Sequence, residues 1–287
     1  MRLLSGLHQV MAPHVPPELT DRIIDSIPID RQCEHYQTLL NCALVSQDWL
    51  PASRCRLFTC VDISTRGGYE SFVANVLRSP RLEPYLKRTK QVVLTNESVC
   101  GFIYGSAGHL PSLESLTIQD VNWKSHPPHP RIHLTISRFS TLRKLVLFQC
   151  QLPSSQMLRR MVSALSTSLR NLHLDNVTWP PVHHGSVPVL QVGPALDTLR
   201  VSYFGDDKGR LAPFFAWLSH TSTATGGSLR VFSLRRTLLL DNHACMAFLQ
   251  LVAPGLVQLS INIAYSTHVG FQLTRSGSSN QCLHSTT

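Results

Sequence analysis

Apolar residues near the start of the chain recur at the spacing of short α-helices. A Pro-Pro-Glu-Leu start opens the first run, where proline is tolerated because the first helical N–H groups have no intrahelical acceptor. The apolar positions of the first two runs are Leu19, Ile23, Ile24 and Ile27, then Leu39, Leu40, Ala43 and Leu44. After a break at Val45-Ser46, a third run extends from Trp49 to Phe58. The spacing predicts three short amphipathic helices, a bundle that buries little surface by itself.

From Leu113 onward the chain repeats a Leu-x-x-Leu-x-Leu pattern, with Ile, Val or Phe allowed at the later positions. The copies begin at Leu113, Leu142, Leu169, Leu196, Leu229 and Leu256, so their starts are 29, 27, 27, 33 and 27 residues apart. Side chains alternate along a strand, so the fourth and sixth residues of each copy point the same way. One such strand cannot bury its apolar face alone, whereas stacked neighbours form a parallel sheet with a shared core.

The segments around these repeats divide into strands, helices and irregular crossings. Before the repeats, the pattern predicts strands at Cys60–Ser64 and Gln91–Thr95 with a helix at Tyr69–Arg78 between them. Return helices are predicted at Ser154–Leu165, at Leu211–Leu218 and after Asp241, a candidate N-cap. The Pro- and His-rich returns Trp123–Phe139 and Trp179–Pro194 are predicted to be extended or irregular. After Ile263 the chain becomes polar without a helix pattern, which predicts a disordered or frayed tail.

The N-terminal residues follow an order that is known from one protein family. Pro-x-Glu-Leu at Pro16, Ile-Ile at Ile23, Leu-Val-Ser at Leu44 with Trp three residues later, and then Leu-Phe resemble the F-box, as seen in fungal F-box-like proteins. The resemblance covers Val15–Phe58, although the loop Pro28–Tyr36 is longer than the usual link between the first two helices. It implies docking on a Skp-type adaptor of a cullin-RING ubiquitin ligase.

The candidate adaptor-binding residues are those that match the motif positions. They are Pro16, Pro17, Leu19, Ile23, Leu44, Val45 and Trp49. Ile24 and Ile27 are expected to pack inside the bundle instead. The alternative is a plain helical bundle in which all of these residues pack on each other and no adaptor binds.

The repeats resemble the leucine-rich-repeat family, because their spacing lies in or near the range of repeat lengths known for that family. The Asn or Cys expected three residues after the last Leu of each copy occurs only as Cys150, while the other copies have Val121, Val177, Phe204, Thr237 and Ala264. Residues that flank the core positions should face outward on the concave side. They are Lys144, Val146 and Phe148; Asn171, His173 and Asp175; Thr198, Arg200 and Ser202; Val231, Ser233 and Arg235; Gln258, Ser260 and Asn262. The candidate target-binding residues among them are Lys144, Phe148, His173, Arg200, Val231 and Arg235, and the alternative is a generic solvated face.

Composition and charge favour a folded protein that is not specialised for nucleic acid or membranes. The 287 residues are 43% apolar and 15% charged, which is typical of globular chains. The formal net charge is +9, but the basic residues are dispersed, so an acidic protein partner is favoured over nucleic acid. No apolar run approaches the roughly 18 residues that span a bilayer. Eight scattered cysteines without a Cys-x-x-Cys pair fit a reducing compartment, so the location expected is cytoplasmic or nuclear.

Motifs for catalysis or cofactor binding are missing from the sequence. It has no phosphate-binding loop of the Gly-x4-Gly-Lys type, no Gly-x-Gly-x-x-Gly and no Gly-x-Ser-x-Gly elbow. The histidine pairs His126/His129 and His183/His184 lie in Pro-rich loops without a second pair of metal ligands, so we interpret them as solvated. We therefore expect no metal, no cofactor and no enzymatic activity; an enzyme with an unrecognised site is the rival interpretation.

Together these patterns predict an α/β protein: an N-terminal F-box three-helix segment followed by an irregular leucine-rich-repeat solenoid with a parallel sheet. The expected organisation is an F-box-like domain over residues 13–58, a connecting segment with the first part of the solenoid over 59–108, the solenoid over 109–265 and a tail over 266–287. The function that the resemblance implies is substrate recognition for a Skp-cullin-F-box ubiquitin ligase, with the Skp-type adaptor, its cullin and an unidentified target protein as partners. The alternative is a repeat scaffold unrelated to ubiquitination.

Overall fold

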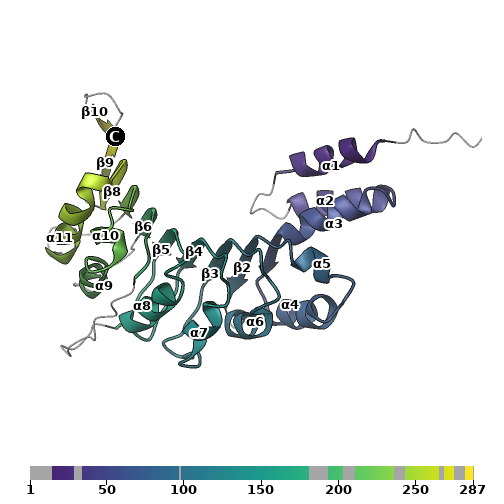
Figure 1. Ribbon diagram of the computed structural model, residues 1–287, viewed down its shortest axis with the longest axis horizontal. Coiled ribbons are helices and arrows are strands. Elements are labelled where there is room, and N and C mark those ends of the chain that lie inside the picture. The colour runs from purple at the N-terminus through teal and green to yellow at the C-terminus, as the bar shows by residue number, and fades with distance from the viewer. Residues whose placement is uncertain are drawn as a thin grey trace, which may run out of the picture. The chain divides into compact units, whose positions relative to one another are not determined.

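The computed structural model describes residues 15–28, 34–96, 98–180, 193–202, 211–235, 243–264, 268–274 and 282–286 (Figure 1). The chain divides into two compact units, Met1–Cys60 and Val61–Thr287. The first unit is helical, and the second contains a parallel sheet with helices. The predicted end of the helical segment, Phe58, lies two residues before this division.

The helical unit contains three helices at the positions that the apolar spacing predicts. They are α1 (Pro17–Ser26), α2 (Glu34–Val45) and α3 (Leu50–Thr59). Pro17 occupies the first position of α1, and the carbonyl of Pro16 accepts hydrogen bonds from the backbone N–H groups of Leu19 and Thr20. Proline at this position fixes φ where no intrahelical bond is lost. The two prolines thus favour the start of α1 at a defined residue.

The three helices share a small core, and hydrogen bonds join α1 to α3. Ile24 of α1, Leu39 of α2 and Ser53 of α3 are buried. The guanidinium of Arg56 donates from Nη2 to the carbonyl oxygens of Asp25, at 3.2 Å, and Ile27, at 2.9 Å. These carbonyls belong to the C-terminal end of α1, where backbone acceptors have no helical partner. Arg56 therefore fixes the end of α1 against α3.

The second unit is built on a sheet whose strand order follows the sequence. The strands are β1 (Cys60–Ile63), β2 (Gln91–Thr95), β3 (Ser115–Gln119), β4 (Lys144–Phe148), β5 (Asn171–Asp175), β6 (Thr198–Ser202), β7 (Val231–Arg235) and β8 (Gln258–Ala264). Each neighbouring pair from β2 to β8 is parallel. The prediction of an α/β protein with a parallel sheet is confirmed.

The register of the sheet aligns the repeated leucines into rows. Leu116 pairs with Leu145, Leu145 with Leu172 and Leu172 with Leu199, and all four side chains are fully buried. A second row runs from Ile118 through Leu147, Leu174 and Val201. Because each row continues from strand to strand, each repeat completes the core of its neighbours.

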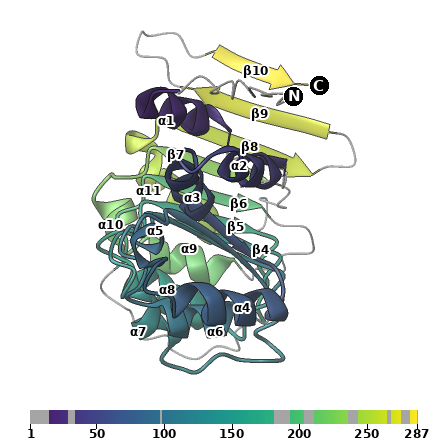
Figure 2. The same cartoon turned by 90° about the vertical axis from the view of Figure 1, so that its right-hand side faces the viewer.

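Helices and turns return the chain from one strand to the next. They are α4 (Arg66–Phe72), which continues into a π-helical turn at Val73–Leu77, then α5 (Glu83–Leu86), α6 (Ser98–Ser106), α7 (Ile132–Ile136), α8 (Ser155–Ala164), α9 (Ala212–Leu218), α10 (Ser222–Thr225) and α11 (His243–Val252), with a 3₁₀ turn at Ala253–Gly255. Figures 1 and 2 show α6, α7, α8 and α9 on the same side of the sheet. The opposite side of β3 to β7 is left open by these helices.

Several return segments differ from the sequence prediction. The crossing Trp123–Phe139, predicted to be irregular, contains the short helix α7, because Ile132 and Ile136 are buried against the rest of the unit. Most of the crossing Trp179–Pro194, and Asp241, lie outside the described residues. The polar segment predicted as a tail contains β9 (His268–Thr274) and β10 (Cys282–Thr286). Strand β9 is antiparallel to β8, and backbone pairing of this kind requires no apolar pattern.

A repeated turn ends the strands β3, β4 and β5. The residue after each strand has a left-handed backbone, and the next residue is buried; these pairs are Asp120–Val121, Gln149–Cys150 and Asn176–Val177. The backbone N–H of Asp120 donates to the backbone carbonyl of Phe148 at 3.0 Å, and the backbone N–H of Gln149 donates to the backbone carbonyl of Asp175 at 2.8 Å. Val121 and Val177 thus occupy the position where the leucine-rich-repeat pattern has Asn or Cys. Backbone hydrogen bonds between neighbouring turns stabilise this corner.

Helix α6 was not predicted from the sequence, because it contains two glycines. The structure shows that these glycines allow the helix to pack closely against α4. Built on Gly101, a Cβ atom would lie 2.8 Å from Cε1 of Tyr69, and one on Gly105 would lie 3.1 Å from the Tyr69 hydroxyl. The glycines therefore make room for the ring of Tyr69, which belongs to α4. Glycine weakens an isolated helix, so packing against α4 and the sheet overrides its low propensity.

We expect Gly101→Ala to destabilise the protein, although alanine favours helix formation. The new methyl group would overlap the Tyr69 ring, and overpacking of this kind costs about 1–3 kcal/mol. Gly67→Ala in α4 is the matched control, because a Cβ there has no atom within 4 Å. This second change should stabilise the protein by about 0.4–1 kcal/mol. Urea denaturation of both variants measures the difference, and equal stability of the two would contradict the packing role of Gly101.

Within the residues that the structure describes, no helix combines the length and the apolar character needed to cross a membrane.

Candidate functional site

The helical unit exposes apolar side chains on the first two helices. The exposed fractions are 49% for Leu19, 45% for Ile23, 47% for Leu40, 84% for Leu44 and 68% for Val45. Leu19 and Ile23 are four residues apart on α1, as Leu40 and Leu44 are on α2, so each pair lies on one side of its helix. We call these five residues the α1–α2 apolar surface.

The same two helices bury a different set of side chains. Thr20 and Ile24 of α1 are 1% exposed, and Leu39 of α2 is fully buried. Each buried residue is next in sequence to an exposed apolar one, because successive residues of an α-helix are about 100° apart around the axis. The apolar stripe of each helix is therefore wider than the core of the unit can cover. Apolar side chains that the core leaves exposed are available for contact with another molecule.

The structure locates every predicted adaptor-binding residue in this unit. Pro16 and Pro17 are exposed at the start of α1, together with Leu19, Ile23, Leu44 and Val45, whereas Trp49 is half-buried. Of the two residues expected inside the bundle, Ile24 is buried and Ile27 is half-buried. Leu40 was not among the predicted residues. Its i, i+4 relation to Leu44 is the sequence signal that could have identified it.

The open side of the sheet carries the predicted target-binding residues. Lys144, Phe148, His173 and Val231 are half-buried there, and Arg200 and Arg235 are exposed. The parallel register places His173 beside Arg200 in the middle row and Phe148 beside Asp175 in the row at the C-terminal ends of the strands. The six residues therefore lie on one face, spread over β4 to β7.

Two residues that were expected to face outward are almost enclosed. Val146 is 9% exposed and Ser233 is 8% exposed, although both have the outward parity of their strands. Val146 lies between Thr117 and His173 in the middle row, and Ser233 lies next to Arg200. Strands are about 4.8 Å apart, so longer neighbouring side chains cover short ones. Both side chains therefore have the outward direction that was predicted, but their neighbours leave little of either exposed.

Charge on the open side is predominantly basic. Over β4 to β7 it carries Lys144, Arg200 and Arg235, and its acidic residue is Asp175. These side chains are partly or fully exposed, and the positive potential favours an acidic protein surface over a basic one. Over β4 to β7 the open side therefore carries an excess of basic side chains.

A polar hollow of about 370 Å³ lies just beyond the strand ends. It is lined by Asp120, Asn122, Gln149, Gln151, Asn176 and Thr178, together with Val121. Asn122, Gln151 and Thr178 form isolated parallel bridges with one another, so the amide side chains come from stacked turns. Carboxamides both donate and accept hydrogen bonds, as a peptide backbone requires. The signal in the sequence is a polar residue directly after β3, β4 and β5, which the repeat pattern alone did not identify.

Histidine and cysteine are the side chains that most often serve metal binding or nucleophilic chemistry. No group of three or more His, Cys, Asp or Glu side chains comes together there in a way that could hold a metal ion. His126 and His129 are exposed, in agreement with their interpretation as solvated loop residues, and His183 and His184 lie outside the described residues. Cys150 is a free thiol that is completely buried. Its Sγ lies 3.3 Å from the carbonyl oxygen of Phe148 and 3.5 Å from that of Ile118.

Burial raises the pKa of the Cys150 thiol to about 12. We therefore expect Cys150 to resist iodoacetamide in the native protein at pH 8, because only the thiolate reacts. The raised pKa lowers the thiolate fraction by roughly three orders of magnitude relative to a free cysteine. Mass spectrometry after alkylation, with the urea-unfolded chain as control, measures the modification. Native labelling of Cys150 at the rate of the unfolded chain would contradict its burial.

The same pKa predicts how stability changes with pH. Below about pH 8.5 the thiol is protonated in both the folded and the unfolded chain. Between this pH and about 12 the unfolded thiol ionises while the folded one does not, so the contribution of Cys150 to stability is lost as pH rises. Cys150→Ala should remove this part of the alkaline slope in urea denaturation between pH 8 and 10.5. If the slope were unchanged in this variant, groups other than Cys150 would be responsible for the loss of stability at alkaline pH.

Comparison with known proteins gives no family for the chain, because no protein-family model matches it and no curated protein is significantly similar.

Proposed function

We propose that this chain is the substrate-recognition subunit of a Skp-cullin-F-box ubiquitin ligase. In this proposal the three N-terminal helices act as an F-box, and the α1–α2 apolar surface binds a Skp-type adaptor. The strands and returns act as an irregular leucine-rich-repeat solenoid whose open side binds the target protein. The chain itself performs no covalent chemistry.

The observation that carries the proposal is the exposure of the α1–α2 apolar surface. Its residues belong to the segment whose order of Pro, Leu, Ile and Trp resembles the F-box, and Leu44 and Val45 are the two most exposed of them. Full burial of one such side chain stabilises a complex by about 1.5–3 kcal/mol. A partner that covers several of them would therefore gain enough free energy for stable binding, even after the cost of association.

The proposed mechanism is a gain in effective concentration. A target held on the sheet is tethered to the ligase through the helical unit, so transfer of ubiquitin becomes an intramolecular event with millimolar effective concentration. The basic residues of the open side, Lys144, Arg200 and Arg235, would select an acidic target surface. Separate surfaces for adaptor and target fit the division of the chain into two units.

Direct binding to an adaptor tests the proposal. The intact chain, mixed with a purified Skp-type adaptor, should elute as a one-to-one complex in size-exclusion chromatography and should recruit a cullin through the adaptor. Failure of the folded chain to bind the adaptor would overturn the ligase role. The open side of the sheet would then support the alternative, a repeat scaffold for protein binding without ubiquitination.

A further inference from the structure

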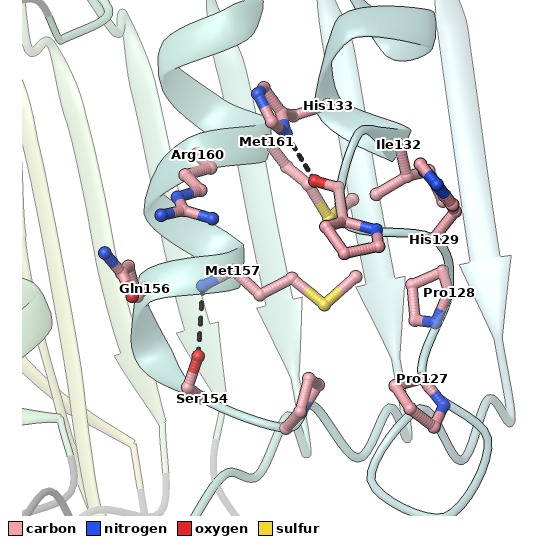
Figure 3. A pocket seen from close by; sticks show the side chains of 12 residues that line it. Pro127, Pro128, His129, Ile132, His133, Ser154, Gln156, Met157, Arg160 and Met161 are labelled. Atoms are coloured by element: carbon pink, nitrogen blue, oxygen red, sulfur yellow. Dashed lines mark hydrogen bonds between the residues drawn. The ribbon is translucent and has the colours of Figure 1, made fainter.

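A separate pocket lies on the helical side of the sheet, between the loop before α7 and the start of α8. It has a volume of about 220 Å³. Ile132 and Met161, both buried, line its interior, and Pro127 and Pro128 form a wall. Figure 3 shows the side chain of Met157 extending from α8 toward this proline wall. Pockets that hold drug-sized ligands have about 300–1,000 Å³, so this one suits a single side chain of a larger partner.

The loop that forms the wall is held in place by hydrogen bonds. His133 donates from Nδ1 to the carbonyl of Pro130 at 3.0 Å, and the backbone N–H of Arg131 donates to Nδ1 of His129 at 3.2 Å. The hydroxyl of Tyr104, on α6, is 3.5 Å from the carbonyl of His129. Prolines also restrict the backbone of this loop. The pocket is therefore preorganised, which lowers the entropic cost of binding.

The part of the chain that forms the pocket is rich in basic residues. Between Asp120 and Asp175 the sequence contains no Asp or Glu but eight Lys and Arg residues, of which Lys144 lies on the open side of the sheet and Arg159 is buried. Arg160 lines the pocket and is exposed. Lys124, Arg131 and Arg138 are exposed in the segment that leads to and through α7. The start of α8 also lies at the pocket, and a helix N-terminus carries partial positive charge.

We propose that this pocket binds an acidic linear peptide of a partner protein. One apolar side chain of the peptide enters the space between Met157, Met161 and the prolines. The flanking Asp or Glu residues contact Arg160 and the basic surface around it. This site is distinct from the open side of the sheet, and the proposal does not depend on adaptor binding.

The lining favours a peptide over nucleic acid. Single-stranded nucleic acids bind on aromatic platforms, whereas no Phe, Tyr or Trp lines this pocket. Its two histidine rings, His129 and His133, form hydrogen bonds within the loop. Met157 and Met161 offer flexible, polarisable contacts that adapt to Leu, Met or Phe side chains. An apolar pocket beside a single positively charged rim residue thus combines anchoring with charge selection.

A peptide array tests the inference on the full chain. The array carries 12-residue peptides with one Leu, Phe, Met or Trp among Asp, Glu, Ser and Gly residues, and the best binders are measured by fluorescence anisotropy. We expect micromolar Kd values that rise at least tenfold when the apolar residue becomes Ser, or when the acidic residues become Asn and Gln. A single-stranded 12-nucleotide RNA is measured in parallel.

Two pocket variants and one matched control locate the binding site. Arg160→Glu and Met157→Asp should each weaken peptide binding at least tenfold. Arg81→Glu, the same charge change at an exposed arginine outside the pocket, should leave it unchanged. Circular dichroism verifies folding of each variant. The proposal is overturned if no peptide binds below 1 mM, if both pocket variants bind as the wild type does, or if the RNA alone binds.

Discussion

Leu44→Lys is expected to raise the Kd for a Skp-type adaptor at least 100-fold while leaving the melting temperature within about 2 °C of the wild type. Leu44 is 84% exposed, so a lysine there meets water in the free chain. At an apolar interface the same ammonium group would have to be desolvated without a partner, which costs several kcal/mol. A loss of about 2.7 kcal/mol corresponds to 100-fold in Kd. Leu44 also lies in the last turn of α2, where a cation suits the helix dipole.

Leu251→Lys provides the matched control for this prediction. Leu251 is 54% exposed and lies in the last turn of α11, in the other unit of the chain, so the chemical change and the helical position are the same. Isothermal titration calorimetry should give the wild-type Kd for this variant. If Leu44→Lys also bound the adaptor with the wild-type Kd, the α1–α2 apolar surface would not be the adaptor-binding surface.

The positions of the main elements followed from periodicity because burial imposes it. The repeated leucines of β3 to β8 placed the strands and their inward faces. The i, i+4 spacing of Leu19 and Ile23 placed α1, although the residues that this helix buries are Thr20 and Ile24. Helix α6 escaped prediction because Gly101 and Gly105 lower its intrinsic propensity, while contact with Tyr69 compensates. Such tertiary compensation cannot be read from a local pattern.

The surfaces were less predictable than the core. Periodicity identifies an apolar stripe on α1 and α2, but it does not show that the stripe is wider than the available core, which leaves Leu40 and Leu44 exposed. Parity along a strand places Val146 outward, yet its exposure depends on the neighbouring strands. The pocket between the loop before α7 and the start of α8 joins segments of successive repeats that are about thirty residues apart in the sequence. Its formation depends on packing between repeats.

Phe215→Ala is expected to cause the largest loss of stability in the sheet-containing unit. Phe215 of α9 is fully buried, and its ring centroid lies 5.6 Å from that of Phe248, 5.9 Å from that of Phe214 and 6.3 Å from that of Phe232. These rings join α9, α11 and β7. Truncation of a buried phenylalanine to alanine costs about 3–5 kcal/mol because it leaves a cavity. A typical domain has only about 5–15 kcal/mol of net stability.

The loss should be concentrated at the C-terminal end of the sheet, because each repeat contacts mainly its neighbours. Hydrogen exchange measured by mass spectrometry should show lost protection in β7 and α11, with β3 and β4 less affected. Phe148→Ala, at a half-buried ring on the open side, is the control and should cost much less in urea denaturation. Equal destabilisation by the two variants would mean that the aromatic cluster does not dominate this end of the core. Adaptor binding by Phe215→Ala should persist, since the α1–α2 apolar surface belongs to the other unit.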